Sequence, residues 1–290
     1  PVVDRLIRVD LPTDDLVEIE GDVWTFDRSG SLAPGDPDQN AEPKYTYRQG
    51  ISQLGKLLVE TAGLDVRRQT RVAAINQLPG GWELRDDQNH ALGTFEQVIL
   101  TIPSPQCRDL IAAGSMNETL QSKLLAALGG SSFHRQFSFV LGFDEALPRR
   151  HPFHALVSTD ATHPVAWLSF EEDKPGHLPA GQGALVVQMS PAWSDEHIDV
   201  DREVLLEKVV SEAAALLGED FRQPDWWDSQ RWMMAHPVTA VNVEDLAEAA
   251  SHGLFFAGDG MVGRGRVPLA LESGLKAAET LQESLALGTG

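Results

Sequence analysis

One stretch near the end of the chain, residues 253–274, constrains the fold more than any other. It runs Gly-Leu-Phe-Phe-Ala-Gly-Asp-Gly-Met-Val-Gly-Arg-Gly-Arg-Val-Pro-Leu-Ala-Leu-Glu-Ser-Gly. The apolar run Leu254–Ala257 predicts a short strand, and the glycines after it predict a thin loop. Beyond Pro268, leucines at helical spacing predict an amphipathic helix. A strand, a glycine-rich turn and a helix in this order are typical of an α/β fold.

The turn Gly258-Asp259-Gly260 places one carboxylate at the carboxyl end of the predicted strand. Flanking glycines let the backbone approach a ligand closely, and the carboxylate accepts hydrogen bonds from the hydroxyls of a ribose or a ribityl chain. Pro268 suits a first helical turn, whose free N–H groups favour an anion. Taken alone, however, Gly-Asp-Gly is also a common tight turn that needs no ligand.

The longer pattern resembles the C-terminal flavin segment of FAD-dependent amine-oxidase-like proteins. It combines Phe-Phe-Ala-Gly-Asp, a glycine-rich gap and a Ser-Gly helix. Other segments resemble the same family in the same order: Tyr47–Leu54, Thr70–Ile75 and Val98–Pro105. Within the family, the likeness is to the renalase branch. This likeness is carried by four segments: Gln49-Gly-Ile-Ser52, Leu100-Thr-Ile-Pro-Ser-Pro105, Arg231-Trp232 and Gly258-Asp-Gly260.

The resemblance implies FAD as the cofactor. Because the flavin carries the hydride chemistry, no acid–base pair is required, and we assign no catalytic residue. It also implies that Val72 meets the adenine through its backbone and that Trp232 approaches the flavin ring. For His236, four residues beyond Trp232, a structural role is favoured over one in the same pocket. The implied cofactor-binding residues are Val72, Pro103, Trp232, Gly258, Asp259, Gly260, Arg266, Val267 and Pro268.

Flavoproteins of this kind begin with a strand, a Gly-x-Gly-x-x-Gly turn and a helix that hold the pyrophosphate. Residues 1–40 offer no such unit, and Gly258-x-Gly260-x-x-Gly263 is not followed by a βαβ arrangement. We therefore expect either a fragment that lacks its N-terminal unit, a separate chain that supplies it, or a degenerate FAD-free relative. The absence of an initiator Met favours the fragment.

The predicted fold is α/β, with a discontinuous, Rossmann-like FAD/NAD(P)-binding domain and a mixed-sheet substrate domain. The FAD-binding domain is expected over 44–104 and 250–290, and the substrate domain over 1–43 and 105–249. The elements predicted before residue 105 are helix Ser52–Ala62 and strands Leu16–Ile19, Val23–Phe26, Leu64–Arg67, Thr70–Ile75, Trp82–Arg85 and Phe95–Ile102, with an irregular loop over Asp27–Lys44. Those predicted after it are helix Glu203–Leu217 and strands Gln136–Phe143, His154–Ser158, Val165–Phe170 and Ala184–Ser190.

The function implied by the renalase-like features is oxidation of dihydro-nicotinamide isomers, with O2 reoxidising the flavin to give hydrogen peroxide. Flavin-dependent amine oxidation is the alternative enzyme hypothesis. A non-catalytic remnant that binds a partner through the substrate-domain sheet is the alternative of a different class.

Charge and cysteine content exclude other classes. The chain has 43 Asp and Glu against 23 Lys and Arg, a net charge of −20, which disfavours nucleic acid and anionic membranes as partners. A single cysteine, Cys107, excludes an intramolecular disulfide and a cysteine-based zinc site. His151, His154 and His163 are interpreted as loop residues rather than as metal ligands. We expect a cytoplasmic protein that acts on a small molecule and binds no metal.

Overall fold

The computed structural model describes residues 2–288 and divides the chain into two compact units. Unit 1 comprises Pro1–Ile7, Asp65–His134 and Met234–Gly290, and unit 2 comprises Arg8–Leu64 and Arg135–Met233. The units differ from the predicted domain boundaries, because residues 44–64 belong to unit 2 and residues 1–7, 105–134 and 234–249 to unit 1. Each unit is therefore discontinuous in sequence.

Unit 2 is built on a seven-stranded mixed sheet with the order β13-β9-β12-β11-β10-β2-β3. Its strands are β2 (Asp22–Phe26), β3 (Leu32–Pro34), β9 (Ser132–Phe143), β10 (Phe153–Ser158), β11 (Val165–Phe170), β12 (Gly183–Met189) and β13 (Trp226–Thr239). The first residues of β9, 132–134, and the last residues of β13, 234–239, belong to unit 1. β2 and β10 are parallel, whereas β9 to β12, β12 to β11, β11 to β10 and β2 to β3 are antiparallel. The predicted strands of the middle region thus form one sheet, and Val165–Phe170 is confirmed residue for residue.

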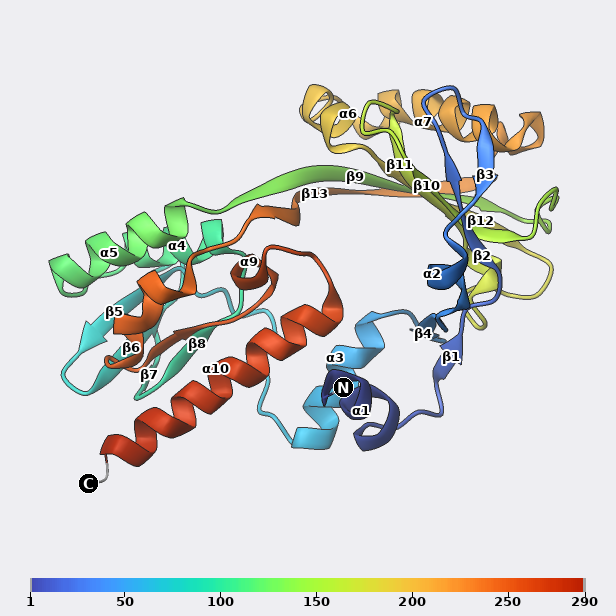
Figure 1. The fold of residues 1–290 in the computed structure, drawn as a ribbon. Coiled ribbons are helices and arrows are strands. Elements are labelled where there is room, and N and C mark those ends of the chain that lie inside the picture. The colour runs from blue at the N-terminus through green and yellow to red at the C-terminus, as the bar shows by residue number, and fades with distance from the viewer. Residues whose placement is uncertain (1, 289–290) are drawn as a thin grey trace. The chain divides into compact units, whose positions relative to one another are not determined.

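One face of this sheet is covered by α7 (Arg202–Leu217), as Figure 1 shows. One face of the helix, with Leu205, Val209, Ala213 and Leu216, is buried and shares one core with aromatic and aliphatic side chains of β9 to β12. The carboxylate of Asp201 caps the helix by accepting from the Glu203 N–H at 3.2 Å. Leu205, Val209 and Leu141 are all fully buried in this core, so unit 2 has a continuous apolar layer of its own.

The remaining elements of unit 2 are short. They are β1 (Leu16–Glu18), β4 (Tyr45–Tyr47), α2 (Pro37–Ala41), α3 (Ser52–Ala62), α6 (Pro191–Glu196) and the 3₁₀ turns η2 (Glu171–Asp173) and η3 (Glu219–Phe221). β1 and β4 form an antiparallel pair. Helix α3 is confirmed at both ends, and Gly63 is its left-handed cap.

The region predicted to be an irregular loop, 27–44, contains both β3 and α2, so that prediction was wrong. Asp36 caps α2 by accepting from the Asp38 N–H at 2.9 Å. The Asn40 amide accepts from the Val23 N–H at 2.9 Å and donates to the Val23 carbonyl at 3.0 Å, which ties α2 to β2. Side-chain bonds to backbone groups far away in sequence order this segment despite its prolines.

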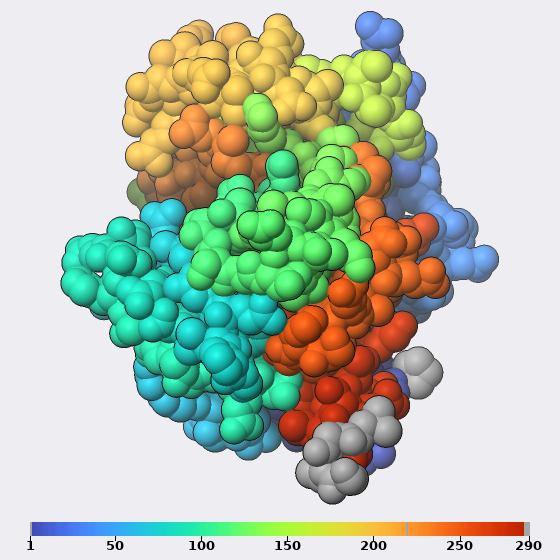
Figure 2. Space-filling view, turned by 90° about the vertical axis from the view of Figure 1, so that its left-hand side faces the viewer, coloured from blue at the N-terminus to red at the C-terminus, as the bar shows by residue number. Residues whose placement is uncertain are grey.

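Unit 1 holds a three-stranded antiparallel meander and a two-stranded parallel sheet. Its strands are β5 (Ala74–Leu78), β6 (Gly81–Arg85), β7 (Ala91–Phe95), β8 (Val98–Leu100) and β14 (Leu254–Phe256). Its helices are α1 (Val2–Arg5), α4 (Ser104–Ala113), α5 (Glu118–Gly129), α8 (Ala247–Ala250), α9 (Asp259–Val262) and α10 (Val267–Gly288), with a 3₁₀ turn η4 (Val243–Leu246) and a π-helical turn η1 (Leu6–Asp10) that leads into unit 2. The meander, the α4–α5 pair and the C-terminal segment adjoin in one surface (Figure 2).

Several predictions for unit 1 need correction. Residues 64–67 form no strand, β5 begins at Ala74 rather than at Thr70, and the predicted strand Phe95–Ile102 is divided into β7 and β8. Helices α4 and α5 were not predicted. They pack on each other and on β5, and they bury the face that contains Leu120, Leu124 and Leu128.

Candidate functional site

The glycine turn follows β14 directly, and β14 pairs in parallel with β8. Gly258 has φ of +118°, a conformation that residues with a side chain rarely adopt. A Cβ at this position would also lie 3.3 Å from the Thr101 carbonyl oxygen, just beyond the end of β8. The carboxyl ends of two neighbouring parallel strands thus meet at the turn, which is where α/β sheets bind their ligands.

Gly260 lies against the start of α4. A Cβ on Gly260 would stand 2.4 Å from the Ser104 hydroxyl oxygen, so a side chain at this position would force that hydroxyl to move. Ser104 is completely buried, and its Oγ has no hydrogen-bond partner among the described residues. Leaving a buried hydroxyl without a partner is costly, so the Ser104 Oγ is a polar group beside the turn whose hydrogen-bonding capacity the described residues do not use.

The loop after the turn ends in the long helix α10. Gly263 closes α9 in a left-handed conformation, and the Gly258 N–H donates to the Ser273 hydroxyl at 3.2 Å. Helix α10 begins at Val267, and the Ala270 N–H donates to the Arg266 carbonyl at 3.0 Å. Pro268 is its second residue, as the sequence predicted for the first turn.

His236 lies against the same loop within unit 1. A Cβ on Gly265 would be 2.6 Å from the His236 Nδ1, so the ring and the loop backbone are in close contact. Burial of the ring is the main cause that lowers the pKa of His236, and the charges of Arg266 and His134 lower it further. Asp259 opposes this by raising the pKa. Two histidines, an arginine and an aspartate therefore share this side of the loop.

The structure brings most of the predicted site residues together. Gly258, Asp259, Gly260, Arg266, Val267 and Pro268 form one continuous segment of unit 1. Pro103 is the N-cap of α4, directly before Ser104. Val72 lies outside any strand, just before β5, and packs on the core of unit 1. Trp232 lies on β13 in unit 2 and is 50% exposed.

Sequence reasoning missed Ser104 and Ser273 as partners of the turn. Ser104 follows Pro103 in a segment that was singled out, but nothing in the sequence indicates that its hydroxyl lies under Gly260. Ser273 belongs to the Ser-Gly pair of the predicted helix, and its distance of 15 residues from Gly258 gives no local signal. Both contacts are tertiary.

The residues of the turn fit the flavin end of an FAD molecule. The site offers a carboxylate for hydroxyl donors at Asp259, a helix N-terminus at Val267 and a buried hydroxyl at Ser104. Gly258 and Gly260 leave no side chain between the backbone and a ligand. The Asp259 carboxylate can accept from a polyhydroxyl chain, and the N–H groups at Val267 can donate to the carbonyl oxygens of a ring joined to that chain.

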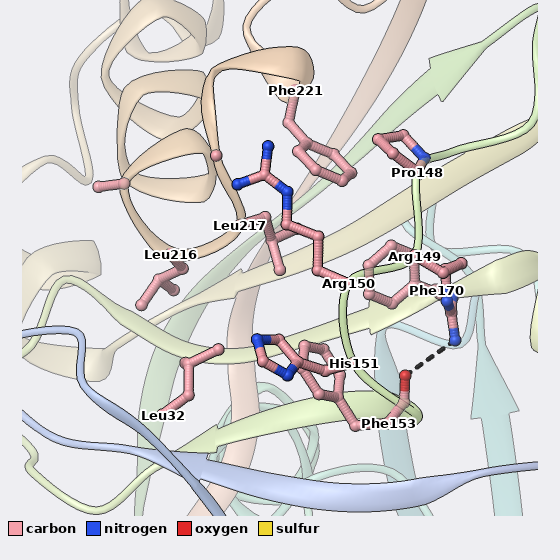
Figure 3. Close-up of a pocket in the computed structure, with 12 residues that line it drawn as sticks. Leu32, Pro148, Arg149, Arg150, His151, Phe153, Phe170, Leu216, Leu217 and Phe221 are labelled. Atoms are coloured by element: carbon pink, nitrogen blue, oxygen red, sulfur yellow. Dashed lines mark hydrogen bonds between the residues drawn. The ribbon is translucent and has the colours of Figure 1, made fainter.

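A separate cavity of about 230 Å³ lies in unit 2, between the end of α7 and the β9–β10 connection. Figure 3 shows the Arg149 side chain over Phe170, and its guanidinium donates to the Phe153 carbonyl at 2.8 Å. Arg149 is paired with Asp173, and Arg150 is paired with Asp220 at 3.0 Å. The cavity contains none of the predicted site residues, and its arginines are already neutralised.

The three histidines interpreted as loop residues have different environments in unit 2. His154 is a buried residue of β10 rather than a loop residue, so that interpretation was wrong for it. His163 accepts from the Val165 N–H at 3.0 Å, and the His151 ring lies tilted by 40° against Trp24 with ring centroids 5.2 Å apart. Over residues 2–288, no group of three His, Cys, Asp or Glu side chains is arranged to hold a metal.

Comparison with solved structures defines the class of fold. The chain resembles a protein described as a protoporphyrinogen oxidase from Exiguobacterium sp. 255-15, with a TM-score of 0.64 and 20% identity over 83% of this chain and 52% of that one. It also resembles cyclohexylamine oxidase from Brevibacterium oxydans IH-35A, with a TM-score of 0.64 and 14% identity over 85% and 55%. Reduced UDP-galactopyranose mutase matches with a TM-score of 0.64 and 16% identity over 85% and 53%. At these identities the likeness establishes the fold alone, which is the mixed α/β fold that these three proteins share.

The chain belongs to the family of flavin-containing amine oxidoreductases, whose family model matches residues 17–282. The cofactor expected from the sequence, FAD, is confirmed at the level of this family. The chain spans about half the length of the solved structures that it matches. The renalase branch stays a prediction.

No helix within residues 2–288 is both long and apolar enough to cross a membrane.

Proposed function

We propose that the chain is an FAD-dependent oxidoreductase whose unit 1 holds the flavin end of the cofactor. The observation that carries this proposal is the Gly258–Gly260 turn at the ends of two parallel strands, with the unpartnered Ser104 hydroxyl buried beneath it. Family membership supports the same assignment.

In this proposal, each residue of the loop has a defined task. The Asp259 carboxylate accepts from ribityl hydroxyls, and the free N–H groups at the start of α10 lie beside the carbonyl edge of the flavin ring. Arg266 adds positive charge to the same side of the loop. Val72 meets the adenine through its backbone, and Pro103 lies beneath the dinucleotide. Trp232 belongs to unit 2, and its approach to the ring stays a prediction.

The bound cofactor supplies hydride acceptance from the substrate and return of two electrons to O2. The residues of the chain would orient the substrate and exclude water. We propose dihydro-nicotinamide isomers as substrates and O2, which becomes hydrogen peroxide, as the electron acceptor. The features of the renalase branch in the sequence support this choice.

Amine oxidation is the second candidate function. The family takes its description from amine oxidation, and one structural relative is a cyclohexylamine oxidase. The third hypothesis is a non-catalytic binding module that holds no flavin. It is retained if the tests below contradict both enzyme hypotheses.

We propose further that the pyrophosphate-binding strand and helix come from outside residues 1–290, either upstream in the same polypeptide or from a separate chain. The open side of β8 supports this, because β8 pairs only with β14 among the described residues. Parallel sheets are rarely stable with two strands, since they are normally extended and covered on both faces. Ile99 of β8 is 39% exposed, so one face of this sheet is also incompletely covered by the described residues.

The cofactor proposal is tested by titrating FAD with purified protein and following the quenching of flavin fluorescence. We expect Asp259→Ala to raise the Kd for FAD about tenfold or more, because a hydrogen bond to a charged group contributes about 1.5–3 kcal/mol. Asp87→Ala, an exposed position in the β6–β7 turn, is the matched control and should leave the Kd unchanged. Unchanged affinity in the Asp259 variant would refute the ribityl role.

If residues 1–290 alone do not quench FAD, the titration is repeated with the product of the longer coding sequence. Binding there supports an external pyrophosphate unit, whereas no binding contradicts the oxidoreductase proposal. The substrate is then tested anaerobically on the flavin-loaded protein. Bleaching by dihydro-nicotinamide isomers but not by amines supports the first function, and the reverse supports amine oxidation.

A further inference from the structure

The cavity of about 230 Å³ in unit 2 has no part in the proposed flavin site. Its apolar walls are three aromatic rings and three leucine side chains: Phe153, Phe170, Phe221, Leu32, Leu216 and Leu217. An apolar cavity of about 150 Å³ is already large enough to hold benzene. The cavity of unit 2 therefore has room for one aromatic ring that carries a small substituent.

The charged groups beside the cavity are balanced. Arg149 is paired with Asp173, and its guanidinium lies over the Phe170 ring, 3.9 Å from the centroid. Arg150 is paired with Asp220 at 3.0 Å. The two guanidinium groups would repel a cation, whereas an anion would have to displace their carboxylates and would face the negative end of α7. An uncharged ligand meets neither obstacle.

His151 supplies a polar group at the exposed side of the cavity. Its ring is stacked on Phe153 with centroids 5.9 Å apart and is tilted against Trp24 at 5.2 Å, so aromatic contacts fix its orientation. Among residues 2–288, no side chain or backbone group forms a hydrogen bond with either ring nitrogen. Figure 3 shows a nitrogen of this ring turned toward the space between Leu32 and Leu216.

We propose that this cavity binds a small, uncharged aromatic molecule that carries a hydroxyl group. The ring lies between the apolar walls, where it loses its contact with water. The hydroxyl lies on a nitrogen of His151, which it suits because a hydroxyl both donates and accepts hydrogen bonds. A charged analogue of the same shape would lose its hydration without gaining a partner of opposite charge. The site goes beyond the proposed function and does not depend on bound flavin.

The class of ligand is tested by fluorine NMR on protein that carries fluorine-labelled tryptophan. Trp24 lies beside His151, and Trp24→Phe identifies its signal among the seven tryptophans. Benzyl alcohol should shift the Trp24 signal saturably. Benzylamine and benzoate, which have the same ring with a charge, should bind about tenfold or more weakly. No saturable shift with benzyl alcohol, or equal affinity for the three compounds, would overturn the proposal.

The position of the ligand is tested by filling the cavity. Ala215 lines it from an exposed position near the end of α7, so Ala215→Phe should weaken the binding of benzyl alcohol about tenfold or more. Glu207→Phe, at an exposed position about two turns earlier on the same helix, is the matched control and should leave the Kd unchanged. The other tryptophan signals show that both variants are folded. Unchanged affinity in folded Ala215→Phe would contradict a site in this cavity.

The contact with His151 is tested with toluene, which has the ring but lacks the hydroxyl. His151→Phe keeps an aromatic ring at this position and removes both nitrogens. It should weaken the binding of benzyl alcohol about threefold to tenfold, the effect of one hydrogen bond, and leave the affinity for toluene unchanged. His90→Phe, at an exposed position in unit 1, is the control and should change neither affinity. Equal weakening of both compounds, or of neither, would overturn the assignment of the hydroxyl to His151.

Discussion

The two compact units stabilise their strands in different ways. Unit 2 extends its main sheet over seven strands and covers one face with α7, so its large aromatic side chains are buried together. Unit 1 joins a small meander to a parallel sheet of two strands, and its longest helix, α10, leaves Leu275 39% exposed and Leu285 46% exposed. An apolar groove of about 440 Å³ lies between α8, β14 and α10.

The difference indicates that unit 2 supplies a stable scaffold, whereas unit 1 supplies the candidate binding site. Unit 2 has a core that can support a rigid sheet by itself. Unit 1 contains the glycine loop and the unpartnered Ser104 hydroxyl, together with open apolar surface. We infer that unit 1 is the less stable part among residues 2–288 and gains stability when a ligand or a further strand completes it.

The units can be followed separately. Six of the seven tryptophans, Trp24, Trp167, Trp193, Trp226, Trp227 and Trp232, belong to unit 2, so tryptophan fluorescence mainly reports its unfolding. The single cysteine, Cys107, belongs to unit 1 and is completely buried. Burial raises the pKa of Cys107 to about 12, so a thiol reagent at pH 8 should react only after unit 1 opens.

The largest effect is expected from one substitution made in both cores. Leu141 of unit 2 and Leu254 of unit 1 are both fully buried, but Leu254 lines the apolar groove. Leu141→Ala should cost about 4–5 kcal/mol of unfolding free energy, whereas Leu254→Ala should cost about 2–3 kcal/mol, since the cost grows with the cavity created. Urea unfolding followed by tryptophan fluorescence and by Cys107 labelling measures the two. Equal costs would contradict the proposed difference in packing.

A second effect concerns acid stability in unit 2. Burial lowers the pKa of His154 to about 4, and the charges of Lys174, Lys44 and Arg149 act in the same direction. The unfolded chain takes up this proton near pH 6.5, whereas the folded chain does so only near pH 4, so stability is lost as the pH falls between these values. The loss should be about 3 kcal/mol.

His154→Leu removes this group and tests the expectation. Its unfolding free energy should fall less between pH 7 and pH 4 than that of the wild type, by about the same amount. His90→Leu, an exposed position in unit 1, should follow the wild type. Parallel curves for the wild type and His154→Leu would show that His154 does not limit acid stability.

The smallest effect is expected from the helix caps. Asp201 caps α7 in unit 2, and Asn117 caps α5 in unit 1 by accepting from the Thr119 N–H at 3.0 Å and the Leu120 N–H at 3.1 Å. Asp201→Ala and Asn117→Ala should each cost about 1 kcal/mol. Similar costs would show that the units differ in tertiary packing rather than in local helix signals, and markedly different costs would argue against that view.

The sequence predicted those elements whose pattern is local. The periodic apolar stripe and the Gly63 stop define α3, and alternation with Pro and Gly spacing defines β11. Strand β13 was missed because its large apolar residues stand in adjacent groups, Trp226-Trp227 and Trp232-Met233-Met234, rather than alternating with polar ones. Helix α4 was missed although Pro105 is its second residue, a position that suits a first helical turn. Burial of Cys107, Leu110 and Ile111 against distant elements stabilises α4, whereas β13, which is mostly exposed, is held by its pairing with β9.

The candidate site divides in the same way. Residues 258–268 were predicted from one continuous motif, and the structure keeps them together. The approach of Gly260 to Ser104 and of Gly265 to His236 depends on segments far away in sequence, so no local pattern indicated either contact. The sequence therefore predicted which residues form the loop, whereas the residues that contact it, Ser104 and His236, were found only from the three-dimensional structure.

The most direct test of the flavin site is the rate at which Cys107 reacts with a thiol reagent as FAD is added. Cys107 lies on α4, the helix that begins at Ser104 beside the glycine loop. FAD bound at the loop should stabilise the folded form of unit 1, in which the Cys107 thiol is buried. We predict that the reaction slows in proportion to FAD bound, and that Asp259→Ala requires more FAD for the same protection. A Cys107 reaction rate that stays unchanged at saturating FAD would contradict a flavin site in unit 1.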